Sequence, residues 1–157
     1  MKRQQAPPDV LEVLQVLWAL AHALEARSKR MQRDLGVTGP QRLLLRVIGE
    51  SPGCTPGAAA RQLSLNPGTV SRLVSGLERL GLARRQVDRT DGRKQRLTLT
   101  RRGEALNSHH RGTVEGAVRE ALAEAPPDEA RRARRFIGRL THSLAVHEAL
   151  PRSRPAR

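Results

Sequence analysis

The stretch from Leu65 to Thr100 reads LNPGTVSRLVSGLERLGLARRQVDRTDGRKQRLTLT. Its first part has the signals of a helix, because Asn66 is a favourable N-cap, Pro67 suits the first helical turn and Gly81 is typical of a helix end. Two basic segments with alternating polarity follow, and they flank an Asp-Gly pair that begins at Asp91. This pattern favours an antiparallel hairpin. The stretch therefore predicts a helix and then a two-stranded ribbon.

A shorter helix is predicted immediately upstream. Thr55 and Pro56 provide the same cap-and-proline start, and Leu63 lies near its end. Two short helices joined by three or four residues are typical of a helix-turn-helix, and the following hairpin makes it a winged helix. The predicted fold class is mainly α with a small β-hairpin wing. The second helix of the pair has one apolar face, formed by Val70, Leu73, Val74, Leu77 and Leu80.

Further helices are predicted on both sides of this core. Asp9 is a suitable N-cap for the first, and Thr38 with Gln41 has the spacing of a capping box. Thr100 is expected to cap a helix that runs to about Glu124. The last helix begins at Asp128, and the basic residues 151–157 are predicted to be disordered.

The first helix carries apolar residues on more than one side. Leu11 and Trp18 lie off its main stripe, so a partner subunit is expected to cover part of its surface. Packing of both sides inside one small core is the alternative. The main stripe consists of Val10, Val13, Leu14, Leu17, Leu20, Ala21 and Leu24.

The charge of the chain is strongly positive. The 157 residues carry 29 basic and 15 acidic side chains, a net charge of +14. Eleven basic and three acidic residues lie between residues 55 and 103, so most of the excess is concentrated there. This distribution predicts nucleic acid as the first partner to test. With one cysteine, no secretory signal and no long apolar run, we expect a cytoplasmic protein without membrane contact.

The outward face of the predicted recognition helix has residues suited to reading DNA. The first turns of such a helix meet the base edges, so short side chains and hydrogen-bond donors are needed there. Gly68 permits close approach, hydroxyl groups can donate or accept, and Arg72 can bind the O6 and N7 atoms of guanine. A solvated face is the alternative. The DNA-contacting residues predicted on this helix are Asn66, Gly68, Thr69, Ser71, Arg72 and Ser75.

The loop of the predicted wing is also basic. An arginine at the tip of a ribbon can enter the minor groove, where A·T-rich sequence deepens the negative potential. We expect the Asp91 carboxylate to hold the Arg93 guanidinium in an extended position. Arg84, Arg85, Arg96, Arg101 and Arg102 are expected to line the approach and neutralise phosphates. The wing residues predicted to contact DNA are Arg89, Asp91, Arg93 and Lys94.

These features resemble the winged-helix core of the multiple-antibiotic-resistance regulator (MarR) family. The resemblance covers Leu35 to Gly103, close to half of the chain, and is much more specific than a generic helix-turn-helix. Its motifs are T-V-S-R-L at 69–73, L-E-R-L-G-L at 77–82, D-x-x-D-x-R at 88–93 and L-T-L-T-x-x-G at 97–103.

The resemblance implies a homodimer that binds a pseudo-palindromic operator in double-stranded DNA, usually as a repressor. Many members release DNA when a small aromatic or phenolic acid binds between the dimerisation and DNA-binding parts. The implied organisation is a lead-in and dimerisation helix at 1–34, the winged helix-turn-helix at 35–103, dimerisation helices at 104–150 and the tail at 151–157. The implied dimer is built from the first, fifth and sixth predicted helices.

A pocket for such an effector is expected where the first, second and fifth predicted helices meet. Trp18 and His22 share a helix face and are candidates to line it, with Arg42 or His110 as a carboxylate partner. For Trp18, packing in the core or at the dimer interface is an equal alternative. The identity of the effector cannot be read from the sequence.

Other functions have less support. Cys54 is a weak redox candidate, because oxidant-sensing members place their reactive cysteine early in the first helix. The five histidines lack the spacing of a metal site, so no metal or other cofactor is expected. A non-specific architectural DNA-binding protein and a redox- or metal-responsive regulator are the alternatives. No nucleophile–base pair or phosphate loop indicates an enzyme.

Overall fold

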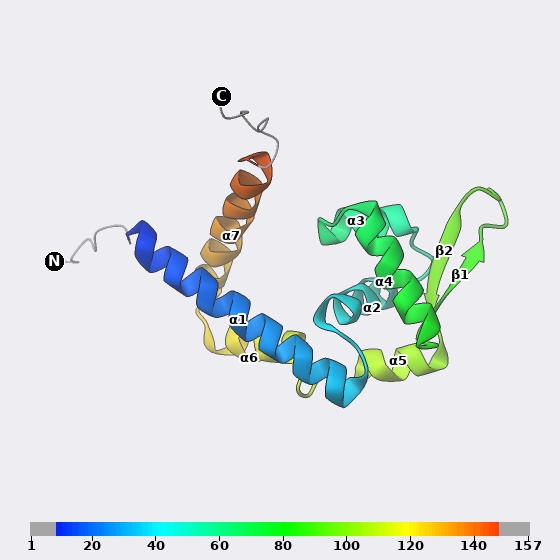
Figure 1. Cartoon of the computed structure of the whole chain (residues 1–157), viewed down its shortest axis with the longest axis horizontal. Helices are drawn as coiled ribbons and strands as arrows, with labels where there is room; N and C mark the ends of the chain where they lie inside the picture. Colours follow the sequence, from blue (N-terminus) through cyan, green and yellow to red (C-terminus); the bar gives the residue numbers. More distant parts are fainter. Residues whose placement is uncertain (1–8, 148–157) are drawn as a thin grey trace, which may run out of the picture. The chain divides into compact units, whose positions relative to one another are not determined.

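The computed structural model of the protein describes residues 9–147, and the expected lead-in at 1–8 and basic tail lie outside these residues. The described part contains seven helices and one hairpin, and Figure 1 shows how they follow one another along the chain. In chain order the elements are α1 (Val10–Leu35), α2 (Gly39–Glu50), α3 (Pro56–Leu63), α4 (Pro67–Arg79), β1 (Ala83–Val87), β2 (Gln95–Leu99), α5 (Arg101–Ser108), α6 (Val114–Glu124) and α7 (Pro127–His147).

The helix starts confirm the predicted caps. Asp9 forms a full capping box at α1, and Thr38 forms another with Gln41 at α2. At α3, α4 and α5 a side-chain oxygen of the residue before the helix accepts a backbone N–H from the first turn. The caps of these three helices are Thr55, Asn66 and Thr100.

The core of the winged-helix part is built around α2, which packs against α1, α3, α4, α5 and β2. Leu44, Leu45 and Ile48 of α2 are fully buried. The predicted apolar face of α4 packs against this helix, with Val70, Val74 and Leu77 fully buried and its remaining two leucines half-buried. Burial of this face fixes which residues of α4 point outward.

The wing is an antiparallel hairpin that projects beyond α4 (Figure 1). Its register pairs Ala83 with Leu99 at the base and Val87 with Gln95 at the far end. The loop before α3 adds a short edge, because the N–H of Leu97 donates to the Cys54 carbonyl oxygen at 2.9 Å. The base of the hairpin is therefore tied to the helical core, whereas its loop is free to reach a partner.

The prediction of one helix from Thr100 to about Glu124 is wrong, because this segment forms two helices, α5 and α6. α5 ends at Ser108 and α6 begins after Thr113. Between them the chain turns at Gly112, whose φ of 73° lies in the left-handed region. Thr113 acts as a new cap, since its hydroxyl oxygen accepts from the Gly116 N–H at 3.1 Å. The break occurs because most of residues 107–112 are poor helix formers and because the carbonyl groups of Leu106, Asn107 and His109 bind Arg42.

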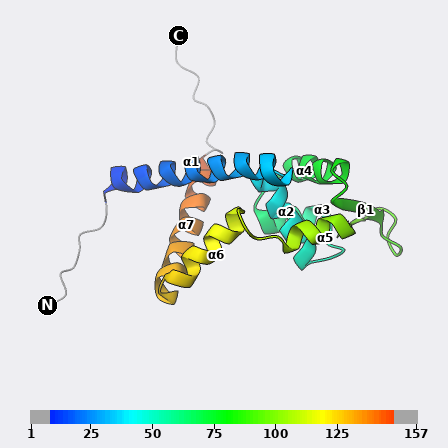
Figure 2. The same ribbon diagram turned by 90° about the horizontal axis from the view of Figure 1, so that it is seen from below.

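The chain divides into two compact units, Met1–Gly116 and Ala117–Arg157. Within the first unit, the C-terminal end of α1 lies beside α2, while its N-terminal part extends away from α2–α5 (Figure 2). Met31 is the buried residue of α1. The large apolar residues of its N-terminal part are exposed: Val10, Leu11, Leu14, Val16, Trp18, Leu20 and Leu24.

Candidate nucleic-acid interface

The outward face of α4 presents the predicted DNA-contacting residues at the surface. Gly68, Ser71, Arg72 and Ser75 are exposed, and Thr69 is half-buried. The amide oxygen of the N-cap accepts from the Thr69 N–H at 2.7 Å, so Asn66 holds the start of the helix in place. The Arg72 guanidinium lies over this first turn, with Nη2 3.4 Å from the Thr69 hydroxyl oxygen.

Helix α4 and the wing are joined by a set of contacts that were not predicted from the sequence. Arg85 of β1 forms an ion pair with Glu78 of α4, with Nε 3.0 Å from Oε2. The Arg85 main-chain N–H donates to the other carboxylate oxygen, and its Nη2 donates to the Ser75 hydroxyl oxygen at 2.8 Å. In the sequence, the only indications of these contacts were the L-E-R-L-G-L motif and the basic strand after it. Arg85 was expected to neutralise phosphate, but its guanidinium is bound to Glu78 and Ser75.

The wing loop is organised by Asp88, which is only 9% exposed. Its Oδ1 accepts from the Thr90 hydroxyl and N–H groups and from the Asp91 N–H, and its Oδ2 accepts from Arg96 Nε. These hydrogen bonds, from Thr90 first and then from Arg96, hold the pKa of Asp88 well below its usual range. Aspartate two residues before threonine was the available signal, since it favours a side-chain turn.

Asp91, near the tip of the wing, pairs with a different residue from the one predicted. Asp91 does not hold the Arg93 guanidinium; its Oδ2 pairs with Lys94 Nζ at 3.0 Å, and its Oδ1 accepts from the Arg93 main-chain N–H. The short aspartate closes a local turn and meets the flexible lysine three residues on. Arg93 is therefore positioned through its backbone, and its side chain is exposed.

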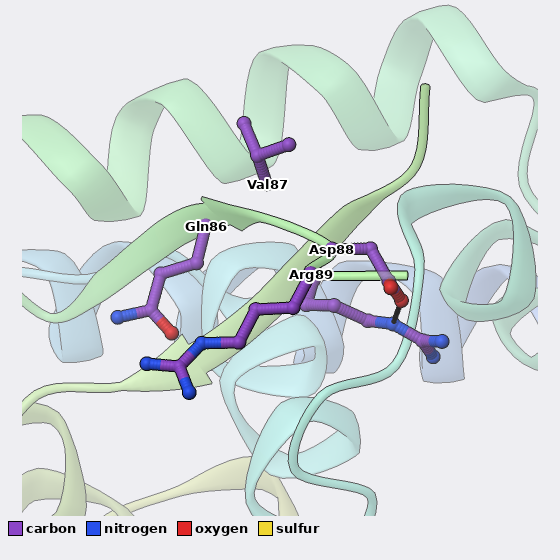
Figure 3. Close-up of a pocket in the computed structure, with 5 residues that line it drawn as sticks. Gln86, Val87, Asp88 and Arg89 are labelled. Atoms are coloured by element: carbon purple, nitrogen blue, oxygen red, sulfur yellow. Dashed lines mark hydrogen bonds and ion pairs between the residues drawn. The ribbon is translucent and has the colours of Figure 1, made fainter. Parts of the chain in front are cut away.

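A hollow on the wing is lined by Gln86, Val87, Asp88, Arg89 and Arg96. Figure 3 shows the Arg89 side chain extending away from the Asp88 carboxylate. Arg96, which was expected to neutralise phosphate, instead bridges Asp88 and the Gly53 carbonyl oxygen. Arg89 remains exposed on the outer surface of the loop.

The exposed positive charge lies along one continuous segment. Within residues 9–147, several arginines between residues 55 and 103 form no ion pair and are exposed, so their charge is available to phosphate groups. They are Arg61, Arg72, Arg79, Arg84, Arg89, Arg93, Arg101 and Arg102.

The residues proposed from the sequence to bind an effector are in different environments. Trp18 is 65% exposed on α1, and His22 of the same helix is also exposed. Arg42 is buried, with its donors directed to Glu115 and to the carbonyl groups of Leu106, Asn107 and His109. His110 is half-buried in the α5–α6 connection.

A metal-responsive or redox-responsive regulator would need a metal site or a reactive cysteine. No group of three or more histidine, cysteine or carboxylate side chains within 9–147 is arranged to hold a metal ion. Cys54 is half-buried beside β2, and burial raises the pKa of its thiol, which lowers its reactivity. In this part of the chain, none of the helices has the length and apolarity needed to cross a bilayer.

Comparisons with known proteins agree with this geometry. A model of the MarR family matches residues 35–94. The HTH-type transcriptional repressor Mb2911 of Mycobacterium bovis is 31% identical over 125 residues, which cover 80% of this chain and 90% of the relative.

Two solved structures share the fold. The PcaV transcriptional regulator from Streptomyces coelicolor, in complex with its natural ligand, has a TM-score of 0.71 at 23% identity, covering 89% of this chain and 99% of that one. Streptococcus pneumoniae FabT in complex with DNA has a TM-score of 0.67 at 21% identity, covering 87% and 98%. This chain therefore belongs to the MarR family and is a DNA-binding transcriptional regulator rather than an enzyme.

Proposed function

We propose that the protein is a homodimeric, sequence-specific repressor that a small aromatic or phenolic effector releases from a pseudo-palindromic operator. The observation that carries this proposal is an exposed outward face of α4 next to an exposed basic wing, two elements that Arg85 of β1 joins through Glu78 and Ser75 of α4. The start of α4 suits the major groove, and the wing loop suits the minor groove.

The start of α4 is the proposed reader of base edges. Its capped first turn directs backbone N–H groups and the positive end of the helix dipole toward phosphate. Gly68 allows the backbone to approach, Thr69 and Ser71 supply hydroxyl groups, and Arg72 supplies two donors for a guanine. Asn66 and Ser75 complete the contact surface at its two ends.

The wing loop is the proposed minor-groove contact. Asp88 and the Asp91–Lys94 pair give the loop a fixed shape before DNA arrives, so less conformational entropy is lost on binding. Arg93 and Arg89 then extend from this loop as exposed cations. Their contacts are proposed to favour A·T-rich flanks.

The proposed dimer uses α1, α6 and α7. The expected fifth helix corresponds to α5 and α6 together, so α6 replaces it in the interface. Exposed apolar residues on α6 and α7 accompany those on α1, and a soluble monomer rarely leaves so many uncovered. They are Val118, Leu122, Phe136, Ile137 and Leu144. A dimer would place two recognition helices about 34 Å apart, one turn of DNA.

Effector binding is proposed near Trp18 and His22, with Arg42 or His110 as the partner of an effector carboxylate. The PcaV structure contains a natural ligand, which supports a ligand-responsive mode in this fold. Because Arg42 already pairs with Glu115, an effector carboxylate must replace Glu115 to reach it. Such a replacement would release the start of α6.

Competition binding tests this function. A duplex is first selected from a random-sequence pool with the full chain, and its affinity is then compared with that of random duplex at physiological salt. We expect a preference of about 10³-fold or more and two protein chains per selected site. Equal binding to both duplexes would support the architectural alternative, which the charge of +14 also allows.

A further inference from the structure

We propose that Arg85 is a positioning residue that sets the sequence preference of the recognition helix through Ser75. This inference deepens the proposed function, because it names what one reader on α4 can recognise and what fixes its geometry. Arg85 itself lies on β1 and reaches Ser75 of α4 from the wing.

The contacts of Arg85 hold two elements at a fixed spacing. Glu78 uses both carboxylate oxygens on this residue, with Oε1 3.1 Å from the main-chain nitrogen and Oε2 3.0 Å from Nε. The same guanidinium reaches Ser75, one helical turn before Glu78, at 2.8 Å from Nη2 to Oγ. Its Nη1 also lies 3.5 Å from the Gln95 side-chain oxygen on β2. This planar group on β1 therefore contacts α4 at two levels and also the neighbouring strand β2.

This arrangement determines the hydrogen-bonding role of Ser75. A guanidinium has donors but no acceptor, so the Ser75 oxygen must accept from it. The hydroxyl proton is then left for a partner on the exposed side of α4. The positive charge behind the oxygen also disfavours a second donor, such as an amino group. Ser75 is thus set to donate to a base or phosphate acceptor.

The chemistry of the major groove gives this setting a consequence. Guanine O6 and N7, adenine N7 and thymine O4 are acceptors, whereas the exocyclic amino groups of cytosine and adenine are donors. A hydroxyl that only donates distinguishes the first group from the second. Without Arg85, the hydroxyl of Ser75 rotates freely and serves either group.

A double-mutant cycle separates this role from ordinary stabilisation. The variants are Ser75→Ala, Arg85→Lys and their combination, and the probes are a duplex selected by the wild-type chain and a random duplex. Lysine keeps the charge and can pair with Glu78, but its single nitrogen lacks the fork that reaches Glu78 and Ser75 together. Arg46→Lys is the matched control, because Arg46 pairs with Glu50 on the same helix, α2, and among the described residues it makes no hydrogen bond or ion pair to α4 or to the wing.

We expect Ser75→Ala and Arg85→Lys each to lower the preference for the selected duplex about 5- to 20-fold, the range expected for one base contact. The double variant should resemble Ser75→Ala, and Arg46→Lys should resemble the wild type. If Arg85→Lys lowers the duplex preference as much in the Ser75→Ala background as in the wild type, the inference is overturned and Arg85 is a structural residue. An unchanged preference in Ser75→Ala would overturn it as well.

Thermal denaturation of each variant keeps the result interpretable. If Arg85→Lys does not fold, Arg85→Gln provides the second test, because its amide can still donate to Ser75 without the charge. A wild-type chain with no preference for any duplex would contradict the proposed function itself. A wild-type preference without coupling between residues 75 and 85 would contradict only the inference.

Discussion

Arg42 of α2 donates from Nε to the carboxylate of Glu115 at the start of α6. The Arg42 side chain is 1% exposed and that of Glu115 is 24% exposed, so a full positive charge lies inside the protein. The remaining donors of Arg42 bind the carbonyl groups of Leu106, Asn107 and His109 at the C-terminal end of α5. One side chain thereby fixes where α5 stops and where α6 begins.

Arg42→Met should therefore be strongly destabilising. The variant leaves Glu115 and several carbonyl groups without their donor, and loss of one partner of a buried pair typically costs about 3–5 kcal/mol. Urea denaturation gives the change in the free energy of unfolding. The control is Arg46→Met on the same helix, whose pair with the exposed Glu50 should contribute less than about 1 kcal/mol. Similar losses in both variants would contradict the role given to Arg42.

The low pKa of Asp88 predicts a specific pH dependence. Its folded-state pKa lies below the unfolded value of about 3.9, so its contribution to stability is full above that pH and is lost as the pH falls toward the folded value. Asp88→Asn has no such ionisation. We expect the wild type to be more stable than this variant at pH 7, and the difference to shrink at pH 3. A constant difference in urea denaturation would count against the hydrogen-bonded carboxylate.

Gly103 is required by the close approach of α5 to the chain between α4 and β1. A Cβ atom at this position would lie 1.9 Å from the Leu82 carbonyl oxygen, which is backbone and cannot move aside cheaply. Gly103→Ala should lower stability by about 1–3 kcal/mol. Gly138→Ala on α7 is the control, since nothing lies within 4 Å, and the alanine should be neutral or slightly stabilising. Thermal denaturation of the two variants should separate them clearly.

Leu14 of α1 tests the proposed dimer. It is exposed in the single chain, and Leu14→Glu would place a charge in the proposed interface. We expect sedimentation to show mostly monomer for this variant and dimer for the wild type. Ala19→Glu is matched in charge but lies about 140° around the helix, so it should remain dimeric. Fluorescence of Trp18 provides a second measurement, because dissociation should shift its emission to longer wavelength.

Local signals in the sequence were sufficient for most of the fold. The caps at Asp9, Thr38 and Asn66 act within a few residues of their own position, so their chemistry is visible in the sequence alone. The hairpin was predicted for the same reason, since alternation and the Asp-Gly pair are local features. The outward face of α4 followed from its apolar face.

Long-range contacts could not be predicted in this way. The break between α5 and α6 depends on Arg42, more than sixty residues upstream, and no local pattern indicates that this arginine is buried. The same limit applies to Arg85, whose partners come from α4 and β2. In the wing, Asp91 met Lys94 rather than Arg93 because two cations were within reach of one carboxylate. Spacing alone did not distinguish them.

The most direct measurement is the effect of Arg72→Ala on binding to the selected duplex and to random duplex. Arg72 is exposed at the start of α4 and forms no ion pair within residues 9–147, so its guanidinium is available to a base. We expect a loss of about 1–3 kcal/mol on the selected duplex and a clearly smaller loss on random DNA. An equal loss on both would show that Arg72 contacts only phosphate and would contradict base reading by the recognition helix.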